Sequence, residues 1–181
     1  MGFTVNEPIR KEFYRTKPLW GYTATWKTVN RNIADLIRLH HPEMDRAVAL
    51  ARNVQIRLES VFSILDDLCA VTCPWCPDHC CLVAKVWLDF KDLLFLHLNG
   101  RQIPTAQPLS HLKDTCRYWS PKGCTLPRIA RPWVCTWYLC PTQMANFRQQ
   151  PKSVQNTFNR AVQAIKTARK EMESEFIRIV S

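Results

Sequence analysis

The sequence predicts a mainly α-helical protein in which two long amphipathic helices frame a cysteine-rich, loop-rich metal-binding centre. Two heptad patterns of apolar residues predict the helices, one over residues 44–68 and one over residues 154–179. The nine cysteines predict the centre, because all of them fall between these two patterns. With 181 residues, 46% of them hydrophobic, the chain is long enough for one domain with a buried core.

The first quarter of the chain is expected to hold an arm and a short helix. Residues 1–26 suit an extended arm with aromatic side chains, namely Phe13, Tyr14, Trp20, Tyr22 and Trp26. Residues 30–39 suit an amphipathic helix with one apolar side, formed by Ile33, Leu36, Ile37 and Leu39. Pro42 then fits the first position of the next helix.

The long helices are predicted from their repeating apolar positions. The first helix repeats two sets of residues, Met44, Ala51, Leu58 and Leu65 and then Ala47, Val54, Val61 and Leu68. The second follows Pro151, with Ser153 as the expected N-cap, and repeats Val154, Phe158, Ala161, Ile165, Ala168, Met172 and, after a miss at Glu175, Ile179. Matching stripes predict antiparallel packing within the chain, and homodimerisation through the same stripes is the alternative.

Between the long helices, the residues 83–88 form a short apolar run that suits one strand. Asp89 with Asp92 then resembles a helix start for residues 90–98, and Asn99-Gly100 supplies its stop. The proline-rich residues 101–150 are expected to form irregular loops that need an internal staple. We therefore expect a single domain with an arm (1–26), helices (27–70), a cysteine-cluster core (71–145) and a C-terminal helix (152–180).

Several classes of protein are excluded by composition. Only four glycines occur, and neither GxGxxG nor a P-loop is present, which argues against a nucleotide-binding fold of either kind. No secretion signal is evident, and no run approaches the ~20 apolar residues of a membrane span. We therefore expect a cytoplasmic protein, in which closely spaced cysteines serve as metal ligands rather than disulfides.

The net charge of +10 is concentrated in one part of the chain. Within residues 93–170, Asp114 is the single acidic residue among twelve lysines and arginines. A solvated basic face is the simple interpretation, and an anionic partner bound through region 93–170 is the alternative.

Eight cysteines are the candidate metal ligands: Cys73, Cys76, Cys80, Cys81, Cys116, Cys124, Cys135 and Cys140. Their thiolates suit zinc or an iron–sulfur cluster, and the C-x2-C spacing lets two sulfurs face one centre. Adjacent side chains usually diverge, so Cys80 and Cys81 serve two centres or one of them is not a ligand. Two tetrahedral zinc sites, or one iron–sulfur cluster with the remaining thiols structural or at a second centre, both fit. Cys69 is expected to be a small buried core residue, with metal ligation as the alternative because it lies four residues before Cys73.

Four residues near the cysteines are candidates for tuning a metal centre. Trp75 and Trp133 are expected to exclude water, and Arg131 to donate hydrogen bonds to a thiolate or sulfide. His79 is expected to lie beside the site, with metal ligation as the alternative.

The order of these cysteines resembles the YkgJ-type cysteine-cluster family, which carries a CxxCxxCC motif. The resemblance covers residues 73–140 and rests on the CxxCxxxCC segment, Cys116, Gly123-Cys124, and Arg131-Pro132 with Cys135. This chain departs from the family by placing three residues, Pro77, Asp78 and His79, before the Cys-Cys pair. The resemblance implies a bound iron–sulfur or zinc centre.

These observations lead to two hypotheses on function. The first is an iron–sulfur protein, with a 4Fe–4S cluster used for electron transfer, redox sensing or support of a partner enzyme. The alternative is a structural zinc module that presents a basic surface to an anionic partner. Catalysis would require an open metal position or a three-cysteine cluster with a free iron, and no catalytic residue is predicted.

Overall fold

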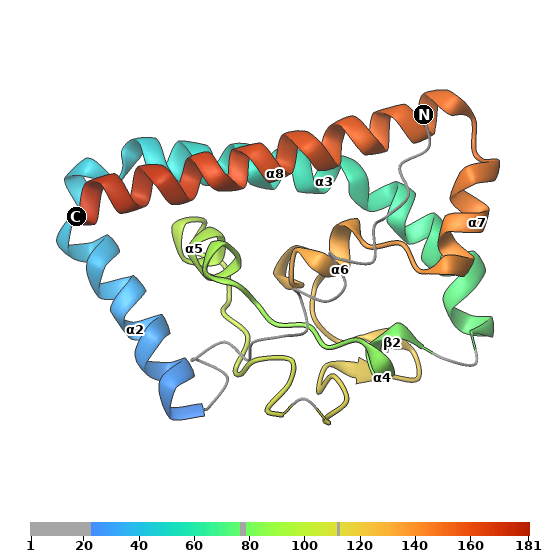
Figure 1. The fold of residues 1–181 in the computed structure, drawn as a ribbon. Helices are drawn as coiled ribbons and strands as arrows, with labels where there is room; N and C mark the ends of the chain where they lie inside the picture. The colour runs from blue at the N-terminus through green and yellow to red at the C-terminus, as the bar shows by residue number, and fades with distance from the viewer. Residues whose placement is uncertain (1–22, 77–78, 112) are drawn as a thin grey trace.

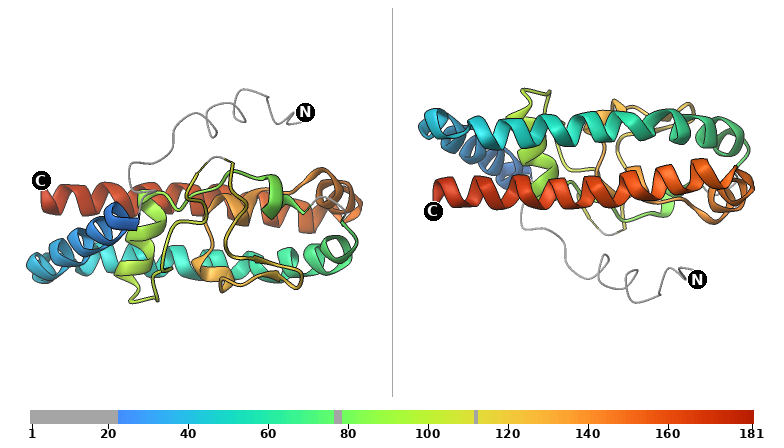
Figure 2. Two further views of the ribbon diagram at one scale, coloured as in Figure 1. Left: turned by 90° about the horizontal axis from the view of Figure 1, so that it is seen from below. Right: turned by 90° about the horizontal axis from the view of Figure 1, so that it is seen from above.

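The structure is a computed structural model that describes residues 23–76, 79–111 and 113–181, and these residues are mainly helical (Figure 1). Two long helices, α3 (Asp45–Thr72) and α8 (Lys152–Val180), run side by side and form one layer, which Figure 2 shows from above and below. The other described elements lie on one side of this layer. They are α2 (Thr23–Leu39), η2 (His41–Glu43), η3 (Cys73–Trp75), α4 (Cys80–Val83), α5 (Phe90–Leu98), β1 (Trp119–Ser120), β2 (Gly123–Cys124), η4 (Arg128–Ala130), α6 (Val134–Trp137) and α7 (Pro141–Gln149).

The two predicted apolar stripes pack against each other and build the core. All eight stripe residues of the first pattern, from Met44 to Leu68, are buried. On α8 the buried stripe residues are Phe158, Ile165, Ala168 and Met172. The prediction of antiparallel packing within the chain is therefore confirmed, and because these side chains are buried inside the chain, homodimerisation through the stripes has no support.

The interruption of the second stripe at Glu175 has a polar explanation. The Glu175 side chain is buried, and its Oε1 accepts a hydrogen bond from the Arg178 guanidinium at 2.7 Å. Arg46 at the start of α3 lies 3.8 Å from the other carboxylate oxygen of Glu175. The ion pairs therefore supply the partners that a buried carboxylate needs.

The first described helix is longer than the sequence predicts. Helix α2 begins at Thr23, so Trp26 belongs to the helix and not to an extended arm. Its side chain is buried, and its indole N–H donates to the Pro104 carbonyl at 3.1 Å. The predicted apolar side of this helix includes the buried Ile33, but Leu39 is 74% exposed. The other aromatic residues expected in the arm (Phe13, Tyr14, Trp20, Tyr22) lie outside the described residues.

The predicted strand at residues 83–88 is wrong. Helix α4 ends at Val83, and residues 84–89 have no regular secondary structure. The backbone of Leu88 bonds instead to one buried side chain: its N–H donates to Gln107 Oε1 at 2.9 Å, and its carbonyl accepts from Gln107 Nε2 at 3.0 Å. A side-chain amide thus replaces the neighbouring strand as the hydrogen-bond partner.

Helix α5 begins and ends where the sequence predicts. Asp89 accepts the Asp92 backbone N–H at 2.8 Å and Asp92 accepts the Asp89 N–H at 2.9 Å, which is a reciprocal cap. At its end, Gly100 adopts a φ of 58°, and the Arg101 N–H donates to the Leu96 carbonyl at 2.8 Å. This αL ending is the conformation that favours glycine.

The start of α8 and the region before it differ from the expectation. The helix begins at Lys152 with Pro151 as the N-cap, so Ser153 is not the capping residue. The Pro151 carbonyl accepts the Gln155 N–H at 3.1 Å and thereby opens the helix. Residues 101–150 contain, besides loops, the helices α6 and α7 and the two-stranded ribbon β1–β2.

The length and the apolar character of the helices determine whether one of them could cross a membrane. None of the helices within 23–76, 79–111 and 113–181 combines the length and the apolar character needed to cross a bilayer.

The packing of α8 on α3 makes a prediction about stability. Replacing Ile165, which is fully buried, by alanine should lower the free energy of unfolding by about 2–5 kcal/mol, because it leaves a cavity in the core. The matched control is Ile177→Ala on the same helix, where the side chain is 47% exposed; we expect a change within about 0.5 kcal/mol. Urea denaturation followed by circular dichroism measures both, and equal losses would contradict the packing of α8 described here.

Candidate metal centre

The nine cysteines are all free thiols, and most of them fall into two groups. We call the first group the loop thiols, which are Cys80, Cys81, Cys116, Cys124 and Cys135. They come from four separate segments: the start of α4, the loop before β1, strand β2 and helix α6. The second group, the helix-end thiols, lies at the end of α3 and the start of α7 and consists of Cys69, Cys73 and Cys140.

Backbone hydrogen bonds bring the segments of the loop thiols together. The Cys116 N–H donates to the Cys81 carbonyl at 3.2 Å, which joins the segment before β1 to α4. The Trp119 N–H in turn donates to the Cys116 carbonyl at 3.0 Å. In the ribbon, Trp119 stands directly opposite Cys124, so their side chains lie on the same face.

The pKa values of the loop thiols show that these groups act on one another. Burial raises the pKa of Cys135, and the neighbouring Cys124 and Cys116 raise it further. Measured over the whole residue, however, much of the surface of Cys135 is exposed. Burial likewise raises the pKa of Cys116, to which Cys124 adds. These mutual effects place the thiols within electrostatic reach, where each thiolate opposes the next.

The adjacent residues Cys80 and Cys81 affect each other's pKa values in opposite directions. The Cys80 thiolate accepts a hydrogen bond from the Cys81 thiol, and this bond lowers the pKa of Cys80 to about 6. The same bond raises the pKa of Cys81, and burial and the charge of Cys80 raise it further. That these two cysteines serve different centres, or that one of them is not a ligand, stays a prediction.

The helix-end thiols are organised by Gln143, a buried residue that the sequence does not single out. Its side-chain Nε2 donates to Cys69 Sγ at 3.3 Å and to Cys73 Sγ at 3.8 Å. Its backbone N–H donates to Cys140 Sγ at 3.5 Å, and its Oε1 accepts the Cys140 N–H at 3.4 Å. Cys69 is partly exposed and bonded to polar groups, so the expectation that it is a small buried core residue is wrong.

The loop thiols and the helix-end thiols are neighbours, and neither group has the geometry of a metal site. The charge of Cys80 contributes to the raised pKa of Cys73, which burial and then Cys69 bring to about 11. Among the described residues, no three Cys, His, Asp or Glu side chains are arranged to hold a metal ion as they stand. Metal binding would therefore require the sulfurs to draw closer together.

Of the residues predicted to lie around a metal centre, Trp75 and Arg131 do not have the predicted surroundings, whereas His79 does. Trp75 is 84% exposed, so it does not exclude water. Arg131 donates to the carbonyl oxygens of Leu126 (3.1 Å) and Cys124 (3.5 Å) and not to a sulfur. The His79 ring stands edge-on to Trp119, with their ring centres 6.0 Å apart, so it lies beside the loop thiols as expected.

One polar atom beside the loop thiols has no partner in the structure. The indole N–H of Trp119 is buried and makes no hydrogen bond. A buried donor without an acceptor is costly. Because Trp119 shares a ribbon face with Cys124, this donor is suited to an acceptor bound at the loop thiols.

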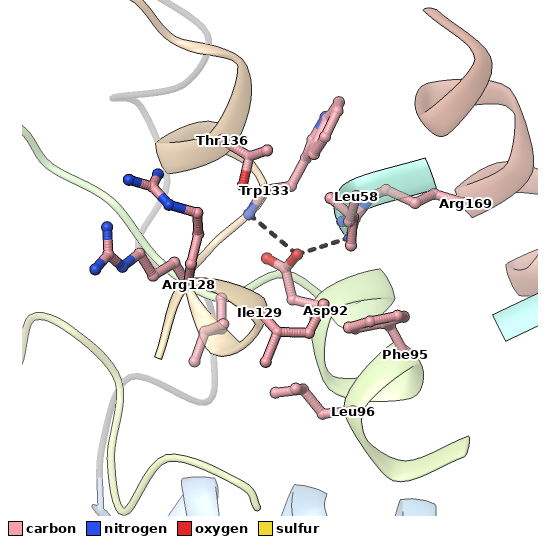
Figure 3. Close-up of a pocket in the computed structure, with 11 residues that line it drawn as sticks. Leu58, Asp92, Phe95, Leu96, Arg128, Ile129, Trp133, Thr136 and Arg169 are labelled. Atoms are coloured by element: carbon pink, nitrogen blue, oxygen red, sulfur yellow. Dashed lines mark hydrogen bonds and ion pairs between the residues drawn. The ribbon is translucent and has the colours of Figure 1, made fainter. Parts of the chain in front are cut away.

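A buried ion-pair network fixes the segment that carries Trp133 and Cys135 (Figure 3). Asp92 Oδ1 accepts the Trp133 backbone N–H at 3.1 Å and lies 2.8 Å from the Arg169 guanidinium. The guanidinium also donates to Asp89 at 2.9 Å, and its centre lies 5.5 Å from the Trp133 ring centre. Burial raises the pKa of Asp92 to about 7, against the lowering effect of Arg169.

This junction is packed rather than hollow. The cavity beside Asp92 has a volume of only ≈ 10 Å³, which is room for one water molecule at most. It is therefore a joint between α5, α8 and the residues before α6, and not a substrate pocket.

The joint makes a prediction about stability. Asp92→Ala should lower the free energy of unfolding by about 3–5 kcal/mol, because it leaves the buried Arg169 with a weaker partner. The matched control is Asp35→Ala, which breaks the exposed pair with Arg38 and should cost about 0–1 kcal/mol. Denaturant titration measures both variants, and similar costs would argue against a buried joint.

Comparisons with known proteins identify no relative. No protein-family model matches the chain, and no curated protein and no solved structure is significantly similar. The resemblance to the YkgJ-type family therefore stays an expectation from the order of the cysteine motifs.

Proposed function

We propose that the loop thiols bind an iron–sulfur cluster of the 4Fe–4S type. The cluster would serve electron transfer, redox sensing or support of a partner enzyme in a reducing cytoplasm. One observation carries this proposal: five free thiols from four separate segments gather within electrostatic reach of one another.

The chemistry of the donor set supports a thiophilic metal. Thiolates favour zinc, copper(I) and iron–sulfur centres over magnesium or calcium. Cys124 and Cys116 each raise the pKa of Cys135, so the thiols resist ionising together. A bound cation removes this repulsion, because it neutralises the thiolates that coordinate it.

The number of thiols also fits a cluster. A 4Fe–4S cluster takes four thiolate ligands, and the loop thiols offer one more than that. Cys116, Cys124 and Cys135 would supply three ligands, and one member of the adjacent pair Cys80 and Cys81 would supply the fourth. The second member of the pair would then remain a neighbouring thiol.

The unpaired indole of Trp119 favours iron–sulfur over zinc. Its buried N–H needs an acceptor, and a cluster offers inorganic sulfides in addition to thiolate sulfurs. Hydrogen bonds to these sulfurs are among the factors that set the reduction potential.

Metal analysis tests this proposal. Protein purified anaerobically should contain iron and acid-labile sulfide and show visible absorption. The double variant Cys116→Ser/Cys124→Ser should lose both, because it removes two of the four ligands. The matched control is Cys69→Ser in the helix-end thiols, which should keep the iron. A colourless protein with stoichiometric zinc, or iron that persists in the double variant, would overturn the proposal.

A second candidate function is a structural zinc module with a basic surface, and the exposed face of α8 favours it. From Lys152 to Lys170 this face carries basic, amide and hydroxyl side chains and no carboxylate. We call it the α8 basic stripe, which consists of Lys152, Asn156, Asn159, Arg160, Gln163, Lys166, Thr167 and Lys170. At 1.5 Å per residue the stripe is about 27 Å long. Such a stripe is suited to an anionic partner with regularly spaced charges.

Salt-dependent binding tests this surface. Double-stranded DNA should bind with an affinity that falls as the salt concentration rises. In Arg160→Glu/Lys166→Glu, the plot of log K against log [salt] should be less steep, with a slope smaller in magnitude by about 2. The control with the same charge change is Lys27→Glu/Arg31→Glu on the exposed side of α2, which should leave the slope unchanged. Binding that is flat across salt, or equal loss in both variants, would exclude this surface role.

A further inference from the structure

The helix-end thiols lie outside the proposed cluster. Cys69 and Cys73 are four residues apart at the end of α3, a spacing that puts two side chains on the same face of a helix. Both sulfur atoms accept a hydrogen bond from the same side-chain amide, that of Gln143. Cys76 follows within the next turn, where its backbone N–H donates to the Cys73 carbonyl at 3.2 Å. Three cysteines thus follow one another at the point where α3 ends.

A fourth cysteine reaches the same place from the other end of the cysteine-rich region. Cys140 is the N-cap of α7, and its sulfur accepts the Gln143 backbone N–H at 3.5 Å. The side chain of the same Gln143 bonds to the sulfurs of Cys69 and Cys73. One buried residue therefore joins the sulfurs of three cysteines that are up to 71 positions apart in the chain.

The surroundings of these sulfurs are electropositive. Gln143 Nε2 lies between Cys69 Sγ and Cys73 Sγ, at 3.3 and 3.8 Å, so a partly positive group is held between two sulfurs. The Arg128 guanidinium lies 3.9 Å from Cys69 Sγ and also pairs with Asp66. The N–H groups at the start of α7 favour negative charge at Cys140. These groups donate hydrogen bonds to the sulfurs, whereas burial and Cys69 raise the pKa of Cys73 to about 11 and keep that thiol protonated until a metal displaces the proton.

We propose that Cys69, Cys73, Cys76 and Cys140 form a second metal site that binds Zn²⁺ with tetrahedral geometry. The site goes beyond the proposed cluster, since it shares no sulfur with the loop thiols. As each Zn–S bond forms, the corresponding thiol releases its proton to solvent. The Gln143 side chain leaves its position between the two sulfurs, and the metal takes its place.

This assignment explains the arrangement of the cysteine motif. The first two cysteines, Cys73 and Cys76, belong to the site at the end of α3. The adjacent pair, Cys80 and Cys81, belongs to the loop thiols, and the three residues between them (77–79) separate the two sites along the chain.

The test uses zinc alone as the probe. Metal-free protein, kept reduced, is dialysed against Zn²⁺ and its zinc content is measured by elemental analysis. We expect two zinc ions per wild-type chain, because zinc also fills the loop thiols when iron and sulfide are withheld. Cys69→Ser/Cys73→Ser and Cys116→Ser/Cys124→Ser should each retain one ion.

Cys140→Ser is the sharpest variant, because it separates metal binding from folding. Serine is a favoured N-cap residue, so this change should leave the helical circular dichroism and the stability of α7 intact. It should nevertheless weaken the second zinc ion by roughly tenfold or more, since loss of an outer-shell partner alone costs 10–100-fold in affinity. A purely structural role for Cys140 predicts no loss of zinc.

The outcomes separate this inference from the proposed cluster. Zinc that is fully retained in Cys69→Ser/Cys73→Ser, or unchanged zinc affinity in Cys140→Ser, would overturn the second site whatever the loop thiols bind. Iron that is absent from anaerobic protein, together with a zinc site lost only in the Cys69 and Cys140 variants, would overturn the cluster and keep the second site.

Discussion

The structure depends on the long antiparallel contact between α3 and α8. This contact buries the two apolar stripes and places the end of α3 and the start of α8 at the same end of the layer (Figure 1). The residues between these two points leave the layer and return to it at nearly the same place. Cys69 and Cys73 at the departure therefore meet α7 and its cap Cys140 at the return, and Gln143 bonds to all three.

The region between the long helices has a second attachment to the layer. Arg169 on α8 pairs with Asp92 on α5, and Asp92 accepts the backbone N–H of Trp133. Because the pair is buried, its net contribution to stability is small compared with the cost of breaking it. The Asp92–Arg169 pair nevertheless holds α5 and the segment leading to Cys135 at fixed positions relative to α8. The loop thiols are thus supported by the helical layer at a point far from the ends of the helices.

The parts of the fold that sequence could predict are those determined by residues close in the chain. The heptad stripes and the reciprocal cap at Asp89 and Asp92 depend on spacings of three to seven residues, and the structure contains them. The predicted strand failed because Leu88 finds its partner in the side chain of Gln107, which no local pattern indicates. The start of α2 was missed because Trp26 is buried through a bond to the distant Pro104.

In the candidate site, too, sequence predicts what depends on residues close in the chain and misses what depends on contacts between distant segments. The cysteines could be chosen from residue type and spacing, but their grouping depends on contacts between segments, such as the bond from Cys116 to Cys81. Gln143 and Asp92 could not be recognised as supports, since a lone glutamine or aspartate carries no sequence signal for burial. Arg131 bonds to backbone carbonyls because its own loop places them nearer than any thiol.

The residues between α3 and α8 leave the helical layer and rejoin it at nearly the same place. This limits how much conformational entropy of the unfolded chain a bound metal can remove. A cross-link stabilises a protein most when it closes a long loop that would otherwise be open. Here the helical layer has already closed the loop of residues 73–151, so a metal bound inside it closes only smaller loops, such as the one between Cys81 and Cys116. Such a metal would order the centre without deciding whether the layer folds, and the chain could gain or lose it while α3 and α8 stay packed.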